Sequence, residues 1–236
     1  MIEFFRNSDE VLLEHSVWLL GNIVADSQFN REYVIKQEIV DRLASVMEEF
    51  GTSDSIKDKI IWFVCNLTRG KLYDHANYFE SIVPSLCNYM STINESKEFS
   101  SCLYTIFKLT STNSRIIEKF ISCKIYHLIS QYIYETQNLS NKIFCVKIIS
   151  NLTGGNDVQT QRLIEQGIIY LFKQLLEEND IKILKEAMWG LSNICAGTVS
   201  QIHKVYDEGL ITKVFELVYR LMPFIDDEDK LYQEVY

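Results

Sequence analysis

The stretch Ala187-Met188-Trp189-Gly190-Leu191-Ser192-Asn193-Ile194 decides the fold, because four earlier segments repeat its pattern. These segments are SVWLLGNI at 16–23, IIWFVCNL at 60–67, CLYTIFKL at 102–109 and CVKIISNL at 145–152. We call the third residue of each segment its anchor. The anchors are Trp18, Trp62, Tyr104, Lys147 and Trp189, which follow one another at intervals of 44, 42, 43 and 42 residues. The chain is therefore built from internal repeats.

Two more amphipathic segments follow the anchor segment of each repeat, as at 160–167 and 168–176. Apolar residues recur in them every three or four positions, which predicts helices. Gly167 and Gly209 stand where the first, short helix must turn into the second. Three helices in about 42 residues is an armadillo-type repeat, which stacks on its neighbours to bury its apolar face. The sequence thus predicts an all-α, right-handed superhelical solenoid of about five repeats, a single domain over residues 1–236.

Composition excludes several classes of protein. The chain has 47% hydrophobic residues and two prolines, which argues against disorder and against a turn-rich all-β fold. A net charge of -9 disfavours general binding to nucleic acid or to anionic membranes and favours a basic partner. The six cysteines form no C-x-x-C pair, which favours a reducing compartment over zinc or disulfide sites. No catalytic motif connects the four histidines, so we expect no enzyme, no metal and no cofactor.

Three anchors belong to a Trp-x-x-x-Asn pair, whose two side chains share one helix face. The pairs are Trp18/Asn22, Trp62/Asn66 and Trp189/Asn193. On one interpretation tryptophan fills the core and asparagine caps a neighbouring helix. The other relies on the regular spacing: amides in a row suit the backbone of an extended peptide, and indoles form slots for Lys or Arg stems. Repetition of the pair in phase favours peptide binding.

Acidic residues complete the candidate site. We expect Asp26 and Asp157 at the C-terminal end of an anchor helix, where backbone carbonyls add negative charge. A carboxylate there, beside an indole, would form a pocket for a lysine ammonium. Glu186 stands three residues before Trp189. Considered alone, Asp26 or Asp157 is better described as a solvated helix-end residue, and Glu186 is likewise ambiguous.

Four stretches resemble repeats of the importin-α (karyopherin-α) family. Residues 17–27, VWLLGNIVADS, are similar to the family's A-V-W-A-L-G-N-I-A-G-D-S, and residues 62–71 to its W-x-L-S-N-L-C-R-G-K. Residues 151–161 resemble N-I-V-T-G-N-D-x-Q-T-Q, and residues 185–197 resemble K-E-A-x-W-x-x-S-N-I-x-A-G. The order and spacing match over nearly the whole chain.

The resemblance implies an import adaptor, present in cytoplasm and nucleus, that binds basic nuclear localisation signal peptides of cargo proteins in a concave groove. The family's major site would comprise Trp18, Asn22, Asp26, Trp62 and Asn66, with Asp26 receiving the key lysine. Its minor site would comprise Asn151, Asp157, Glu186, Trp189 and Asn193. Between the two, Tyr104 and Lys147 interrupt the array, as the family's own array is interrupted.

Some family features have no counterpart in the chain. We find no match to the basic importin-β-binding segment, the first two repeats or the export-receptor surface, so we expect impaired coupling to importin-β and to the export receptor. Residues 1–7 resemble the end of a second helix, and 226–236 approach a sixth anchor, which predicts a solenoid truncated at both ends. The alternatives are an armadillo scaffold for other extended partners and a degenerate, non-functional fragment.

Overall fold

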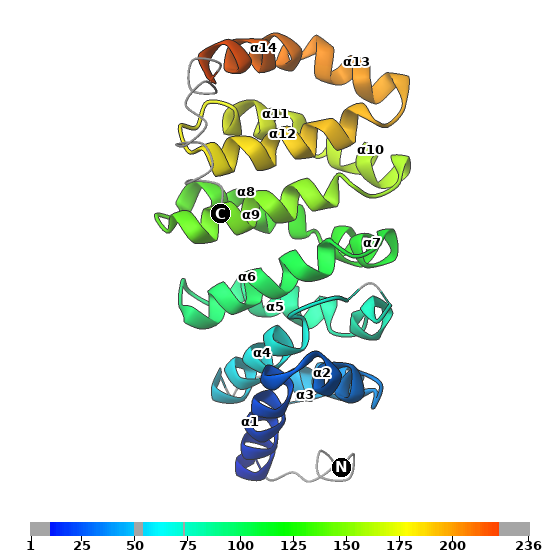
Figure 1. Ribbon diagram of the computed structural model, residues 1–236, viewed down its shortest axis with the longest axis vertical. Helices are drawn as coiled ribbons and strands as arrows, with labels where there is room; N and C mark the ends of the chain where they lie inside the picture. Colours follow the sequence, from blue (N-terminus) through cyan, green and yellow to red (C-terminus); the bar gives the residue numbers. More distant parts are fainter. Residues whose placement is uncertain (1–9, 50–53, 73, 222–236) are drawn as a thin grey trace. The chain divides into compact units, whose positions relative to one another are not determined.

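The computed structural model describes residues 10–49, 54–72 and 74–221 (Figure 1). The chain divides into two compact units, residues 1–128 and 129–236. All regular structure in the described residues is helical. The predicted all-α class is confirmed. The prediction of a single domain over 1–236 stays a prediction.

The first unit contains two complete repeats and the start of a third. Its helices are α1 (Glu10–Asp26), α2 (Gln28–Ile35), α3 (Ile39–Glu49), α4 (Asp54–Leu67), the 3₁₀ helix η2 (Ala76–Phe79), α5 (Val83–Thr92), α6 (Lys97–Thr110) and α7 (Ser114–Ser122). Helix α8 (Ile125–Glu135) runs across the boundary between the units. The anchor helices α1, α4 and α6 stack side by side, each packed on the next (Figure 1).

The second unit repeats this arrangement. It contains α9 (Leu139–Leu152), α10 (Asp157–Glu165), α11 (Ile168–Leu175), α12 (Ile181–Cys195), α13 (Val199–Asp207) and α14 (Leu210–Leu221). The anchor helices α9 and α12 pack on one another, and α11 packs against α12. All five predicted anchor segments are confirmed as helices, in α1, α4, α6, α9 and α12.

The short first helix of the repeat begins at the same kind of residue in four repeats. Ser27, Asn113, Asn156 and Thr198 each accept a hydrogen bond from the backbone N–H three residues later. Such an N-cap satisfies a backbone donor that the helix itself leaves free. The repeat of residues 60–93 departs from the pattern, because its short helix is the single 3₁₀ turn η2.

The turn between the first and second helices requires a left-handed backbone. Gly167 and Gly209 adopt φ angles of 95° and 74°, which confirms the turns predicted there. Glu38 and Lys124, at the same place in earlier repeats, have φ angles of 55° and 58°. The left-handed region costs a residue with a Cβ about 1–2 kcal/mol. The turn is thus imposed by packing of the repeat even where glycine is missing.

The predictions for residues 1–7 and 226–236 lie outside the described residues.

Among the described residues, no helix combines the length and the apolar character that a membrane span needs. Large buried side chains form the interior of each unit, among them Phe63, Phe79 and Phe120 in the first and Phe172 in the second.

Candidate functional site

Two indoles stand on neighbouring helices of the first unit. Trp18 of α1 is 54% exposed, whereas Trp62 of α4 is half-buried. Both line a cleft of about 280 Å³ together with residues of α4 and α6. Core filling therefore does not describe Trp18, because more than half of its side chain is open to solvent.

The close contact between α1 and α4 depends on a glycine. A Cβ at Gly21 would lie 2.2 Å from Cζ3 of Trp62, far inside contact distance. The Trp62 ring therefore lies against the backbone of α1, and Gly21 is the residue that lets it approach. This packing fixes one wall of the cleft.

The anchor asparagines connect one repeat to the preceding one. Asn66 is 1% exposed, and its amide donates to the carbonyl of Gly21 over 3.3 Å. In the second unit the Asn193 amide donates to the carbonyl of Ser150 over 3.2 Å. Gly21 and Ser150 each stand three residues after an anchor, Trp18 and Lys147 respectively, so the bond is the same in both units. The amides of Asn66 and Asn193 therefore cap a neighbouring helix, which is the first of the two interpretations given for the anchor asparagines.

The carbonyl oxygen of Asn66 has no hydrogen-bond partner in the described part of the chain, although it is buried. By contrast, the equivalent Asn22 on α1 is exposed, and Asn151 on α9 is half-buried. A buried amide oxygen without a partner is uncommon, because its desolvation costs free energy. Of the predicted asparagines, Asn22 and Asn193 are therefore the better placed to meet a ligand.

Asp26 is the last residue of α1 and is exposed, as predicted. Its carboxylate accepts a hydrogen bond from the amide of Asn30 over 3.3 Å. The carbonyls that end α1 are also engaged, because Asn30 donates to that of Ile23 and Arg31 to that of Val24. A cation approaching Asp26 therefore meets one carboxylate and a helix end already capped from α2.

The cleft beside Trp18 and Trp62 carries charges of both signs. It is lined by Ser55, Asp58, Lys59, Lys97, Glu98 and Ser101. The Lys59 ammonium and the Ser55 hydroxyl both donate to the Glu14 carboxylate, and these two bonds lower the pKa of Glu14. Asp58 accepts a 2.5 Å hydrogen bond from the hydroxyl of Tyr89. The lining acid Asp58 is thus already partnered within the chain, and the lining residues Lys59 and Ser55 are engaged by Glu14.

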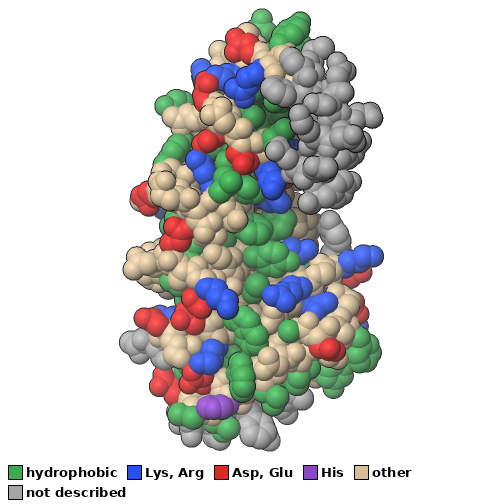
Figure 2. Space-filling model, turned by 60° about the vertical axis from the view of Figure 1, so that its left-hand side comes forward, with side chains coloured by type: hydrophobic (Ala, Val, Ile, Leu, Met, Phe, Trp, Pro, Cys, Tyr) green, Lys and Arg blue, Asp and Glu red, His purple; other side chains and the backbone are tan. Residues whose placement is uncertain are grey.

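These lining residues were not among the predicted site residues. Helical spacing was the signal that could have found them, because Asp58 and Lys59 precede Trp62 by four and three residues and share its face. Figure 2 shows charged side chains of both signs interspersed with hydrophobic ones on one side of the molecule. The lining of the cleft, with Lys59 and Lys97 beside Asp58 and Glu98, is therefore not strongly acidic.

In the second unit, α12 carries the counterpart of this face. Trp189 is 57% exposed, and Glu186 lies one helical turn before it. The Glu186 carboxylate is 4.0 Å from the ammonium of Lys147, the anchor of α9. That ammonium also lies 6.0 Å from the ring centre of Phe144. Lys147, which interrupts the anchor array, therefore already pairs with Glu186, the acid that was predicted to bind a ligand.

The prediction for the position of Asp157 is wrong. Anchor helix α9 ends at Leu152, and Asp157 is the first residue of α10, one after its N-cap Asn156. The four residues 153–156 form the turn that the sequence-based boundary missed. The Asp157 side chain is exposed at a helix N-terminus, where a carboxylate is stabilised by the helix dipole. It gains no partial negative charge from an anchor helix.

Among the described residues, no three His, Cys, Asp or Glu side chains are grouped to hold a metal.

Comparison with known proteins agrees with this architecture. Residues 156–196 match the family model of the armadillo/beta-catenin-like repeat. The chain is 26% identical over 214 residues to importin subunit alpha-1a of Oryza sativa subsp. japonica, covering 89% of this chain and 40% of that protein. It is 25% identical over 194 residues to importin subunit alpha-8 of Arabidopsis thaliana, covering 82% of this chain and 43% of that protein. The chain thus spans about two fifths of these curated relatives.

Among solved structures, the fold is similar to a designed armadillo repeat protein in complex with the peptide (KR)4. The TM-score is 0.77 at 20% identity, and the match covers 92% of this chain and 90% of the designed one. At that identity the likeness concerns the fold. Together with the helix order, these comparisons show that the chain has an armadillo-type fold, that residues 156–196 match the armadillo repeat model, and that the sequence is similar to importin subunits alpha.

Proposed function

We propose that this chain binds basic peptide segments of the nuclear localisation signal type along its anchor helices and acts as an import adaptor between cytoplasm and nucleus. The observation that carries the proposal is the pair of indoles on α1 and α4, one of them 54% exposed, at the mouth of a cleft. An exposed tryptophan beside a carboxylate is a suitable wall for an aliphatic stem that ends in a cation.

The comparisons give this proposal its chemical direction. The relatives are named importin subunit alpha, and the designed armadillo protein was solved with a peptide of alternating lysine and arginine. The net charge of -9 attracts a basic peptide at long range. The two units supply separate candidate faces, Trp18 with Asp26 in the first and Trp189 with Asn193 in the second.

Ion pairs within the chain set a limit on affinity. Glu14 is held by Lys59, and Glu186 by Lys147, so a ligand cation must compete with a lysine that is already in place. Asp26 instead accepts a hydrogen bond from the neutral amide of Asn30, which a cation displaces more readily. We therefore assign Asp26 the largest single contribution to binding of the peptide.

The test is titration of a fluorescent basic signal peptide against the purified chain, by anisotropy. Asp26→Lys is expected to weaken binding about 30-fold, equivalent to about 2 kcal/mol, because an attractive charge becomes repulsive. The matched control is Asp207→Lys, which makes the same charge change at the exposed last residue of α13. Circular dichroism melts of both variants separate loss of binding from loss of fold.

Binding of the Asp26→Lys variant equal to that of Asp207→Lys would reject the site on α1. Tight binding of a peptide with no basic residues would instead favour the scaffold alternative. A chain without a cooperative melt would favour the degenerate fragment. The predictions that the chain is not an enzyme and couples poorly to importin-β and the export receptor stay predictions.

A further inference from the structure

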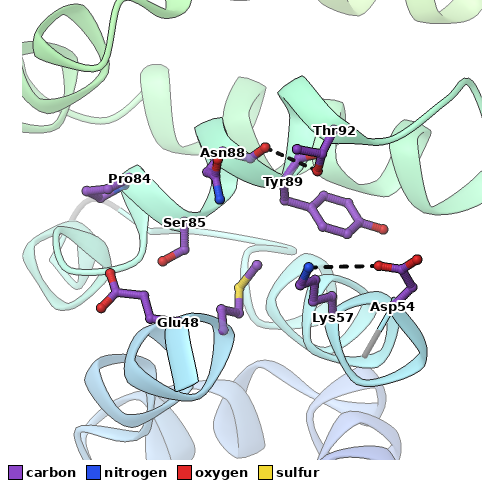
Figure 3. A pocket seen from close by; sticks show the side chains of 9 residues that line it. Glu48, Asp54, Lys57, Pro84, Ser85, Asn88, Tyr89 and Thr92 are labelled. Atoms are coloured by element: carbon purple, nitrogen blue, oxygen red, sulfur yellow. Dashed lines mark hydrogen bonds and ion pairs between the residues drawn. The ribbon is translucent and has the colours of Figure 1, made fainter. Parts of the chain in front are cut away.

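A second cleft of the first unit lies away from the anchor residues. It has a volume of about 550 Å³ and is bordered by the end of α3, the start of α4 and one side of α5 (Figure 3). Its lining is Met47, Glu48, Asp54, Lys57, Pro84, Ser85, Asn88, Tyr89 and Thr92. None of these is a predicted site residue, and the volume falls within the range of ligand pockets, about 300–1,000 Å³.

A buried hydroxyl in this cleft lacks a partner. Ser85 is 7% exposed, and its Oγ has no hydrogen bond to any residue of the described ranges. Figure 3 shows its side chain pointing from α5 into the cleft, toward the side where Glu48 lies. A buried hydroxyl without a hydrogen bond destabilises the free protein, because water no longer solvates it. Occupation of the cleft by a polar group would satisfy it.

Two more polar side chains face the same part of the cleft without partners. No hydrogen bond or ion pair engages the Glu48 carboxylate or the Asn88 amide among the described residues. Other groups in the cleft are occupied: the Lys57 ammonium lies 3.8 Å from the Asp54 carboxylate, and the Tyr89 hydroxyl donates to Asp58. The uncommitted charge of the cleft is therefore the negative charge of Glu48.

We propose that this cleft binds an arginine side chain of a partner protein, independently of the anchor residues. The guanidinium would donate to the Glu48 carboxylate, the Ser85 hydroxyl oxygen and the Asn88 amide oxygen, which together offer acceptors for several of its five donors. Its aliphatic stem would lie on Met47 and Pro84. Arginine fits better than lysine because a planar fork can reach three acceptors at once.

The probe is the blocked tripeptide acetyl-Gly-Arg-Gly-amide, titrated into the full chain carrying ¹³C-labelled methionine methyl groups and ¹⁵N-labelled backbone amides. We expect saturable NMR shifts of the Met47 methyl and of the Ser85 and Asn88 amides. The same peptide with citrulline in place of arginine keeps the shape and removes the charge, and it should bind at least tenfold more weakly. A peptide with glutamate at that place should produce no shift.

Ser85→Ala separates loss of binding from loss of fold, because the two effects are expected to have opposite signs. It removes the buried hydroxyl without a partner, so it should raise Tm while weakening the arginine peptide about fivefold. Glu48→Gln should weaken that peptide at least tenfold, and the control Glu135→Gln, an exposed acid on α8, should leave it unchanged. Equal binding of the citrulline peptide, shifts with the glutamate peptide or full affinity in Ser85→Ala would each overturn the proposal. Because the anchor variant Asp26→Lys leaves this cleft intact, the two proposals can fail separately.

Discussion

Gly21→Ala measures how tightly α1 and α4 are packed. The added methyl carbon would lie 2.2 Å from Cζ3 of Trp62, and overpacking of this kind destabilises a core by about 1–3 kcal/mol. Alanine inside a helix is more stable than glycine by about 0.5–1 kcal/mol. We therefore expect a net loss of about 0.5–2 kcal/mol. For a chain of this size the loss lowers Tm by about 1–8 °C.

The sign of the effect reverses when the indole is removed. In a Trp62→Ala background the new methyl group at Gly21 meets no ring, and helix propensity alone should stabilise the protein by about 0.5–1 kcal/mol. Urea unfolding followed by far-UV circular dichroism gives all four corners of this double-mutant cycle. Equal destabilisation by Gly21→Ala in both backgrounds would refute the contact as the cause.

Three further predictions concern the turns, a thiol and an ion pair. Lys124→Gly, which relieves a left-handed residue, should stabilise the chain by about 0.5–1 kcal/mol in urea unfolding, whereas Gly209→Ala should destabilise it by about 1 kcal/mol; the same sign for both would contradict the turn argument. A hydrogen bond from Cys87 lowers the pKa of Cys123 to about 7 and raises the pKa of Cys87. Iodoacetamide should therefore modify Cys123 at a rate that rises through pH 7. Peptide mapping should find Cys87 unmodified in the folded chain. Lys147→Met removes the competitor of the acid on α12, so it should tighten binding of a basic signal peptide about threefold by anisotropy, and unchanged affinity would mean that the second unit takes no part.

The fold was largely predictable because its pattern is repeated. Each of the five anchor segments is a weak signal alone, but their common interval of about 42 residues made the helices at Trp18 through Trp189 predictable together. The irregular repeat was less accessible. Residues 74–82 should contain a short α-helix by analogy with neighbouring repeats, yet they form turns and η2, since the local sequence lacks the N-cap that Ser27 and Asn113 provide.

The sequence predicted where the candidate site residues lie, but not which hydrogen bonds and ion pairs they form. Spacing placed Trp18 and Asp26 on one exposed helix, as the structure has them. It could not show that Asn66 would turn its amide into the neighbouring helix, because that depends on how closely α1 approaches α4. It also could not show that Lys147 would pair with Glu186, residues 39 positions apart in the sequence. Periodicity indicates which face of a helix a side chain occupies, but it does not identify the residues of other helices that the side chain contacts.

The bond from each anchor asparagine to the preceding repeat has an evolutionary consequence. Its acceptor is a main-chain oxygen, at Gly21 in one unit and at Ser150 in the other, so every amino acid at those places offers the same acceptor. Only the donor side is tied to a residue type. A duplicated repeat that carries its own asparagine can therefore join a neighbour of unrelated sequence without any matching mutation. Drift at the accepting position leaves this hydrogen bond intact, although at Gly21 the Trp62 ring restricts which side chains fit. This is a route by which an array of this kind can lengthen while its members diverge.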